Sequence, residues 1–144
     1  MLETPTESRL RDQVARIPEV WLVYLYGSVA RGDASERSDI DFGVYLDEGL
    51  TPLAMGRLRI ELIGHFVEIT RQDAVDLVVM NRASICQQFE VIKPSKPLFV
   101  RDESKRIDIE ARIMSEYLDW KYYEETHAEI FLAKIRERGE SLRV

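Results

Sequence analysis

The sequence lacks the features of disulfide-bonded, exported and membrane-embedded proteins. It has one cysteine, Cys86, which excludes an internal disulfide bond. No apolar run approaches the ~20 residues that a membrane-spanning helix needs. The first ten residues, MLETPTESRL, have neither the basic start nor the apolar centre of a signal peptide. We therefore expect a cytoplasmic protein that does not engage a membrane.

Basic residues are also in short supply. Acidic residues outnumber lysine and arginine by 26 to 20, which gives a net charge of −6. Contacts to nucleic-acid phosphates need clustered basic side chains, so this charge argues against direct nucleic-acid binding. It leaves nucleotide binding open, because a local pocket can oppose the overall sign.

The length and composition predict one domain over residues 1–144. A chain of 144 residues, 45% apolar and 32% charged, can bury a sufficient core without a disulfide or a structural metal. There are no internal repeats, low-complexity tracts or obvious linkers. We place the core at about 20–123 and assign 124–144 to the C-terminal helix and tail.

Helical and strand patterns alternate along the chain. The run VWLVYLY, 20–26, is continuously apolar and rich in β-branched and aromatic residues, which predicts a buried strand. This alternation predicts an α/β fold in which helices cover a short sheet. The other expected strands are 39–46, 74–81 and 97–102, and the expected helices are 6–17, a short one after 27, 53–69, 82–93 and a long one from 103 to a stop at Gly139.

Aromatic residues interrupt the apolar stripe of the long C-terminal helix. The segment DWKYY, 119–123, breaks the helical spacing that precedes it. We expect these side chains to pack against the domain, and a partner-binding patch is the alternative.

Two carboxylates occupy a predicted strand. Asp39 and Asp41 are two residues apart, so their side chains share one face of the strand, ~6.5–7 Å apart. Gly43 continues this face without a side chain, which we expect to leave room for a ligand. Asp76, early in the next strand along the chain, can lie beside the pair. Such oxygen ligands suit Mg²⁺ or Mn²⁺ and can position groups for phosphoryl or nucleotidyl transfer.

A glycine and a serine end the preceding strand. Gly27 allows the backbone to approach a phosphate closely, and Ser28 can donate its hydroxyl to a phosphate oxygen. The free N–H groups at the start of the following helix favour an anion. Arg31 and Arg37 are candidates for additional phosphate contacts.

These residues resemble the motif of the nucleotidyltransferase superfamily with the DNA-polymerase-beta-like fold. The motif is Gly-Ser, ten residues and Asp-x-Asp, present here as Gly27-Ser28, 29–38 and Asp39-Ile40-Asp41. Within that superfamily the sequence is similar to the MNT minimal nucleotidyltransferases. That similarity is carried by YLYGSVARGDASERSDIDFGVYL, VDLVVMNRAS and PLFVRDESKRIDIEARIMSEYLDWKYY, and it covers about 20–123. The resemblance implies a mixed sheet of about four strands.

The resemblance also implies a function. MNT proteins are typically antitoxins that transfer AMP from ATP to a tyrosine of a HEPN-domain toxin, an RNA-cleaving partner. By that resemblance Asp39, Asp41 and Asp76 bind Mg²⁺, Asp76 acts as general base, and Gly27 and Ser28 hold the triphosphate.

Two alternatives use the same residues differently. A nucleotidyltransferase could modify a small molecule such as an aminoglycoside, although such enzymes usually carry an added substrate-binding domain. An antitoxin could also block its toxin by binding alone, which would leave the acidic residues without a catalytic role. A template-directed or tailing polymerase fits least well with the acidic charge.

Overall fold

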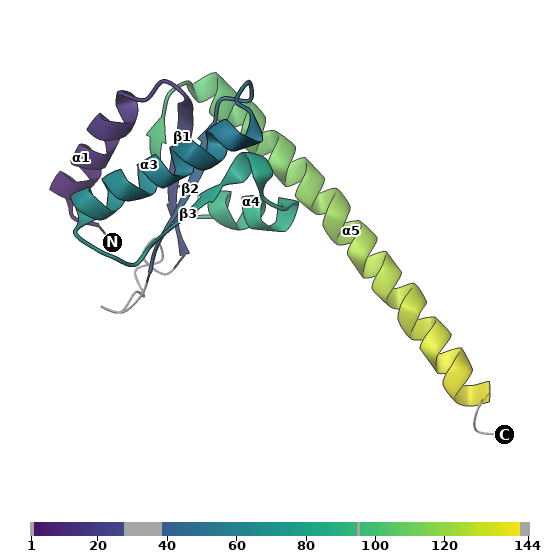
Figure 1. The fold of residues 1–144 in the computed structure, drawn as a ribbon. Helices are drawn as coiled ribbons and strands as arrows, with labels where there is room; N and C mark the ends of the chain where they lie inside the picture. The colour runs from purple at the N-terminus through teal and green to yellow at the C-terminus, as the bar shows by residue number, and fades with distance from the viewer. Residues whose placement is uncertain (1, 28–38, 95, 142–144) are drawn as a thin grey trace.

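A four-stranded sheet lies at the centre of the computed structural model, which describes residues 2–27, 39–94 and 96–141 (Figure 1). The strand order is β3-β2-β1-β4, with β1 antiparallel to both neighbours and β2 parallel to β3. The predicted mixed sheet of four strands is thereby confirmed. The elements are α1 (Thr4–Ala15), β1 (Val20–Tyr26), β2 (Ile40–Leu46), α3 (Pro52–Thr70), β3 (Val75–Val79), the short 3-10 helix η1 (Met80–Arg82), α4 (Ile85–Ile92), β4 (Pro97–Val100) and α5 (Glu103–Ser141).

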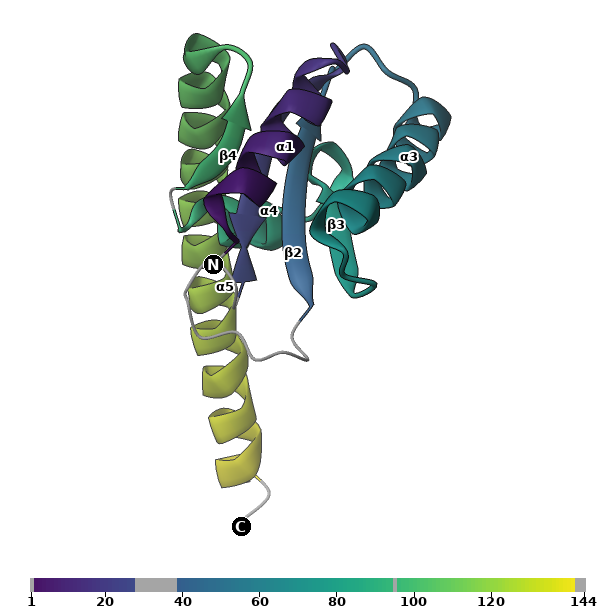
Figure 2. The same ribbon diagram turned by 90° about the vertical axis from the view of Figure 1, so that its left-hand side faces the viewer.

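Helices α1 and α3 cover one face of the sheet (Figure 2). The alternation of β2 sends Ile40, Phe42 and Val44 into this layer, as the sequence predicts. Phe42 packs on Phe66 of α3, with ring centroids 4.6 Å apart. These side chains are almost fully buried. The layer is the larger of the two cores, because more buried residues belong to it than to the core on the opposite face.

Helices α4 and α5 cover the opposite face. Leu22 and Tyr24 of β1 pack there with Val91 of α4 and Ile113 of α5. The hydroxyl of Tyr24 donates a hydrogen bond to Glu110 Oε1 at 2.7 Å, and burial together with this carboxylate raises the pKa of Tyr24 far above its usual range. The phenol therefore stays protonated and ties the start of α5 to the centre of the sheet.

Strand β3 is shorter than the predicted 74–81. The chain leaves the sheet after Val79 and forms η1. Asn81 uses its side chain instead of its backbone: Oδ1 accepts from the Leu46 amide and Nδ2 donates to the Leu46 carbonyl, both at 2.8 Å. This side-chain clamp continues the contact between β3 and β2 without extending the strand.

The distal half of α5 extends beyond the sheet and the other helices (Figure 1). Packing of α5 reaches Tyr117, which stacks on Phe89 of α4 with centroids 3.8 Å apart. Beyond it Tyr122 and Tyr123 are 72% and 65% exposed, so the expected packing of 119–123 against the domain is wrong for these side chains. The expected stop at Gly139 is also wrong, because the helix continues to Ser141. No helix in the described part of the chain is long and apolar enough to cross a membrane.

We expect amide hydrogen exchange to divide α5 into two parts. Residues 121–139 are exposed except for the half-buried Thr126, and in the described part of the chain their hydrogen bond and ring contact stay within α5. An isolated helix is marginal in water. In the isolated chain their amides should exchange at least about tenfold faster than those of 106–117, which are held by tertiary contacts. Hydrogen-exchange mass spectrometry measures this difference. Equal protection along the helix would show that the distal half is held by contacts other than those described.

Candidate active site

Two carboxylates lie side by side on neighbouring parallel strands. Asp41 of β2 and Asp76 of β3 are direct partners in the register, and adjacent strands lie ~4.8 Å apart. Their neighbours Ile40 and Leu77 point into the layer under α1 and α3. Alternation therefore places both carboxylates on the opposite face, where Asp76 is exposed and Asp41 is half-buried.

Gly27 lies against the carboxylate of Asp41. It has a φ of +72°, which favours glycine, and a Cβ built there would lie less than 3.0 Å from Asp41 Oδ2. A side chain at this position would therefore displace the carboxylate. Among the described residues the close neighbour of Gly27 is thus Asp41, and the predicted approach of Gly27 to a phosphate stays a prediction.

Tyr26 is a fourth member of the site, which sequence reasoning missed. It is the antiparallel partner of Asp41 and lies on the same face. Burial raises the pKa of Tyr26 to about 12, and the negative charges of Asp41 and Asp76 add to the effect. Tyr26 therefore keeps a neutral hydroxyl at neutral pH, on the face of the sheet that carries both carboxylates. Its position in β1 could have revealed it. Leu25 points into the core under α1 and α3, so the next side chain, Tyr26, points to the face that carries the carboxylates.

The structure does not bring the other predicted site residues into this group. Asp39 directly precedes β2 and its side chain is exposed. Ser28, Arg31 and Arg37 lie outside the described residues, so their roles stay predictions. Within residues 2–27, 39–94 and 96–141, no three acidic, histidine or cysteine side chains gather as a metal cluster. The structure thus brings together Asp41, Asp76 and Gly27.

The expectation that Gly43 leaves space for a ligand is wrong. A Cβ on Gly43 would lie less than 3.0 Å from Cγ1 of Val91, which is fully buried on α4. The missing side chain therefore allows α4 to pack directly on β2. Any ligand must bind nearer the Asp41 end of the strand, because helix α4 occupies the position above Gly43.

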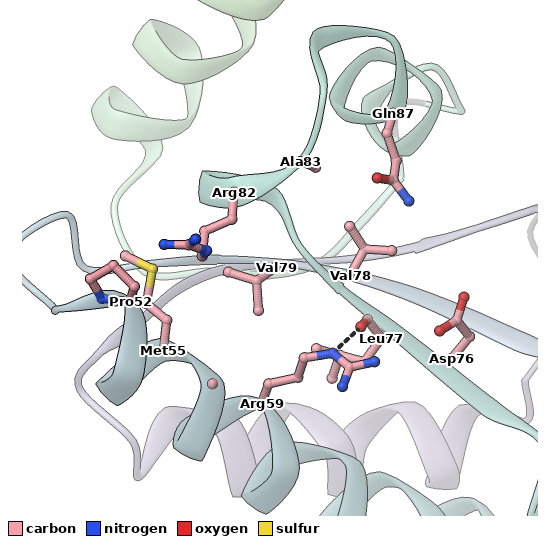
Figure 3. A pocket seen from close by; sticks show the side chains of 11 residues that line it. Pro52, Met55, Arg59, Asp76, Leu77, Val78, Val79, Arg82, Ala83 and Gln87 are labelled. Carbon is pink, nitrogen blue, oxygen red and sulfur yellow. Dashed lines mark hydrogen bonds between the residues drawn. The ribbon is translucent and has the colours of Figure 1, made fainter.

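Cavities lie on both sides of the carboxylate pair. One, of about 500 Å³, is lined by Tyr26 and Gly27 together with Glu90, Lys93 and Pro94 at the end of α4. The other, of about 420 Å³, runs along the edge of β3 and includes Asp76 (Figure 3). Both volumes fall in the range of small-molecule sites. The carboxylates thus lie between a cavity on the β1 side and a cavity on the β3 side.

Comparison with known proteins assigns the class. The chain matches the family described as polymerase beta, nucleotidyltransferase, over residues 9–104. Because this match covers most of the chain, the protein belongs to that family of nucleotidyltransferases. A search of curated proteins found no significant match.

Similar solved structures come from toxin–antitoxin complexes. A complex with AMP-PNP contains a chain of 24% identity and TM-score 0.69, and the similarity covers 91% of this chain and 99% of that one. The MntA–HepT complex contains a chain of 21% identity and TM-score 0.67, and the similarity covers 90% of this chain and 99% of that one. The complex of the tri-AMPylated HEPN toxin of Shewanella oneidensis with MNT antitoxin contains a chain of 21% identity and TM-score 0.62. Here the similarity covers 88% of this chain and 98% of that one. At these identities the likeness establishes the fold.

A substitution at Gly27 should impair nucleotidyl transfer. We expect Gly27→Ala to lower the transfer rate at least about tenfold, because the new methyl group displaces Asp41, and to cost about 1–2 kcal/mol of stability through its positive φ. Transfer of labelled nucleotide and urea unfolding measure the two effects. Gly64→Ala on α3 is the matched control, since open space surrounds that position. A Gly27→Ala protein with the wild-type rate would contradict the placement of Asp41.

Proposed function

We propose that this protein is an antitoxin that transfers AMP from ATP to a tyrosine hydroxyl of a HEPN-domain toxin and so neutralises its RNase activity. The observation that carries the proposal is the pairing of Asp41 with Asp76 beside Gly27, on the fold shared with the toxin–antitoxin complexes. One of those complexes holds AMP-PNP and another holds an AMPylated toxin.

The donor set suits a divalent cation. Carboxylate oxygens are the ligands that Mg²⁺ and Mn²⁺ prefer, and two carboxylates already lie in adjacent register. Asp39, Asp41 and Asp76 would hold Mg²⁺. When bound, the cation neutralises charge on the triphosphate and on the departing pyrophosphate.

The chain's own residues orient the two reactants. In the transfer, the tyrosine oxygen attacks the α-phosphorus of ATP, a new oxygen–phosphorus bond forms, and the bond to the β-phosphate breaks. The hydroxyl proton passes to Asp76, and pyrophosphate leaves. Gly27 and Ser28 hold the triphosphate, with Arg31 and Arg37 contributing further contacts. Catalysis of this kind depends mainly on positioning and on charge stabilisation.

The test combines labelling with a toxin assay. The protein is mixed with α-labelled ATP, Mg²⁺ and the HEPN-domain protein encoded beside it. The proposal expects label on the toxin, loss of RNase activity in parallel, and loss of both effects in Asp39→Asn and Asp41→Asn. Neutralisation without label, retained in both variants, would identify an antitoxin that acts by binding alone. Neither label nor neutralisation would reject the antitoxin role and direct the search to a small-molecule acceptor.

A further inference from the structure

The cavity along β3 carries two arginines. It is lined by residues of α3, β3, η1 and α4, and includes Arg59 and Arg82 beside one carboxylate, Asp76. In Figure 3 the guanidinium of Arg59 lies between Asp76 and Arg82. The order along the chain agrees, because Arg59 contacts Leu77, one residue after Asp76, and Arg82 follows the end of the strand. The positive charges therefore follow the strand away from the carboxylate.

Arg59 is held in place by the strand itself. Its Nε donates a hydrogen bond to the carbonyl of Leu77 at 2.8 Å, and the side chain is half-buried. This bond fixes the plane of the guanidinium, and its two terminal nitrogens have no hydrogen-bond partner among the described residues. In the described part of the chain no carboxylate forms an ion pair with Arg59 or Arg82. A fixed guanidinium without an anionic partner is suited to binding an oxyanion from outside.

The position of this cavity distinguishes the two reactants. The attacking and leaving oxygens of a nucleotidyl transfer lie roughly in line on opposite sides of the phosphorus. If the triphosphate binds at Gly27, on the β1 side of Asp41, the attacking hydroxyl must approach from the β3 side, past Asp76. The Leu77 carbonyl on this edge already accepts a hydrogen bond from Arg59. At this position the edge therefore presents the positive charge of Arg59 to an incoming group.

We propose that Arg59 and Arg82 form an anion site along the β3 edge that selects an acceptor segment bearing negative charge next to its reactive hydroxyl. This inference rests on the proposed transfer to a protein and adds the chemistry by which the acceptor is recognised. The anion is an oxyanion, either a carboxylate of the acceptor protein or the phosphate of an AMP group attached in an earlier round. Arg59 and Arg82 determine specificity here, whereas Asp41 and Asp76 belong to the catalytic machinery.

The charge test compares two pairs of substitutions. Arg59→Gln with Arg82→Gln should lower kcat/KM at least about tenfold for the acceptor that carries the anion, either the unmodified or the singly AMPylated toxin, since each lost charge-assisted hydrogen bond weakens acceptor binding. KM for ATP should stay within about twofold of wild type, because these charges lie on the acceptor side. Arg9→Gln with Arg57→Gln removes the same net charge from exposed positions on α1 and α3 and should change neither value. A raised KM for ATP with an unchanged KM for the toxin would overturn the proposal.

The steric test leaves every charge in place. Gly56 lines the cavity and has open space where a Cβ would go, so Gly56→Leu should fill the cavity and reduce toxin labelling. Gly64→Leu on the same helix, which also has open space and does not line the cavity, is the matched control. Both changes replace a helical glycine and should preserve folding. Equal labelling by the two variants would exclude the cavity as the acceptor path.

The source of the anion follows from the order of transfers. Intact-mass spectrometry counts the AMP groups on the toxin over time. If carboxylates of the toxin bind the arginines, the double glutamine variant slows the first transfer. If the phosphate of an attached AMP binds them, the first transfer proceeds normally and a singly modified toxin accumulates. A variant that shows neither effect while retaining the wild-type rate contradicts the proposal.

A binding measurement separates this inference from the proposed function. The Nε–H of Arg59 is held in a hydrogen bond, which makes its NMR signal observable, and millimolar inorganic phosphate should shift it in the wild type. The shift should shrink in Gly56→Leu and persist in Gly64→Leu. If wild type shifts but does not label the toxin, the antitoxin function fails and the anion site stands. If phosphate produces no shift in the wild type, the anion site is rejected whatever the labelling result.

Discussion

Replacing either paired carboxylate by its amide should reduce AMP transfer at least about 100-fold, the scale seen when one preorganised electrostatic contact is removed from an active site. Asp41→Asn and Asp76→Asn keep the shape of the side chain and remove its charge. The two residues lie side by side in the β2–β3 register, so each substitution leaves only one carboxylate of the pair. Initial rates with α-labelled ATP and toxin measure the effect.

The control for this prediction is a charge removed elsewhere. Asp108→Asn on the exposed side of α5 changes the net charge by the same amount and should retain the wild-type rate. The melting temperatures of both site variants should stay close to that of the wild type, because Asp76 is exposed and relief of repulsion offsets lost contacts of Asp41. A site variant with more than about a tenth of the wild-type rate would show that its carboxylate is not part of the reaction centre.

The contact between β2 and α4 should respond strongly to one methyl group. Gly43→Ala should lower the free energy of unfolding by about 1–3 kcal/mol, because the new Cβ overlaps Cγ1 of the rigid, buried Val91. Since α4 borders the carboxylate pair, we expect transfer activity to fall as well. Urea unfolding and transfer rates, measured on the same preparations, report the two effects.

A size exchange tests whether that contact is the cause. Val91→Ala alone leaves a cavity and is also destabilising. The combination of Gly43→Ala with Val91→Ala should recover part of both losses, with a coupling energy of about 0.5–3 kcal/mol of the compensating sign. Strictly additive effects of the two substitutions would mean that the overlap is relieved by movement elsewhere and that Val91 does not determine the spacing.

Strand periodicity made much of the fold and site predictable. The run 20–26 is short, apolar and rich in β-branched and aromatic residues, which favours a buried strand, and β1 has the predicted bounds. In β2, alternation assigned Ile40, Phe42 and Val44 to one core and Asp41 to the opposite face, which the structure confirms. The placement of Asp76 beside Asp41 followed from the same rule once the two strands were taken as neighbours.

The rest depends on which element covers which face, and local patterns do not encode that. The sequence shows that Gly43 faces the same way as Asp41, but only the packing of α4 reveals that Val91 fills the space above it. The bond from Arg59 to Leu77 spans 18 positions and is equally invisible in the sequence. The exposed Tyr122 illustrates the reverse error, since an aromatic residue near the core was expected to be buried and instead lies on a helix beyond it.

The late position of β4 in the chain has a consequence for biosynthesis. Strand β4 completes the sheet by pairing with β1, and Arg101 then donates to the carbonyls of Val20 and Ile17 at 2.8 and 2.9 Å. A ribosome makes β1 long before β4, so the apolar flank of β1 stays unsealed on the nascent chain until about residue 101 has emerged, and stalled or truncated products would expose a template for aggregation.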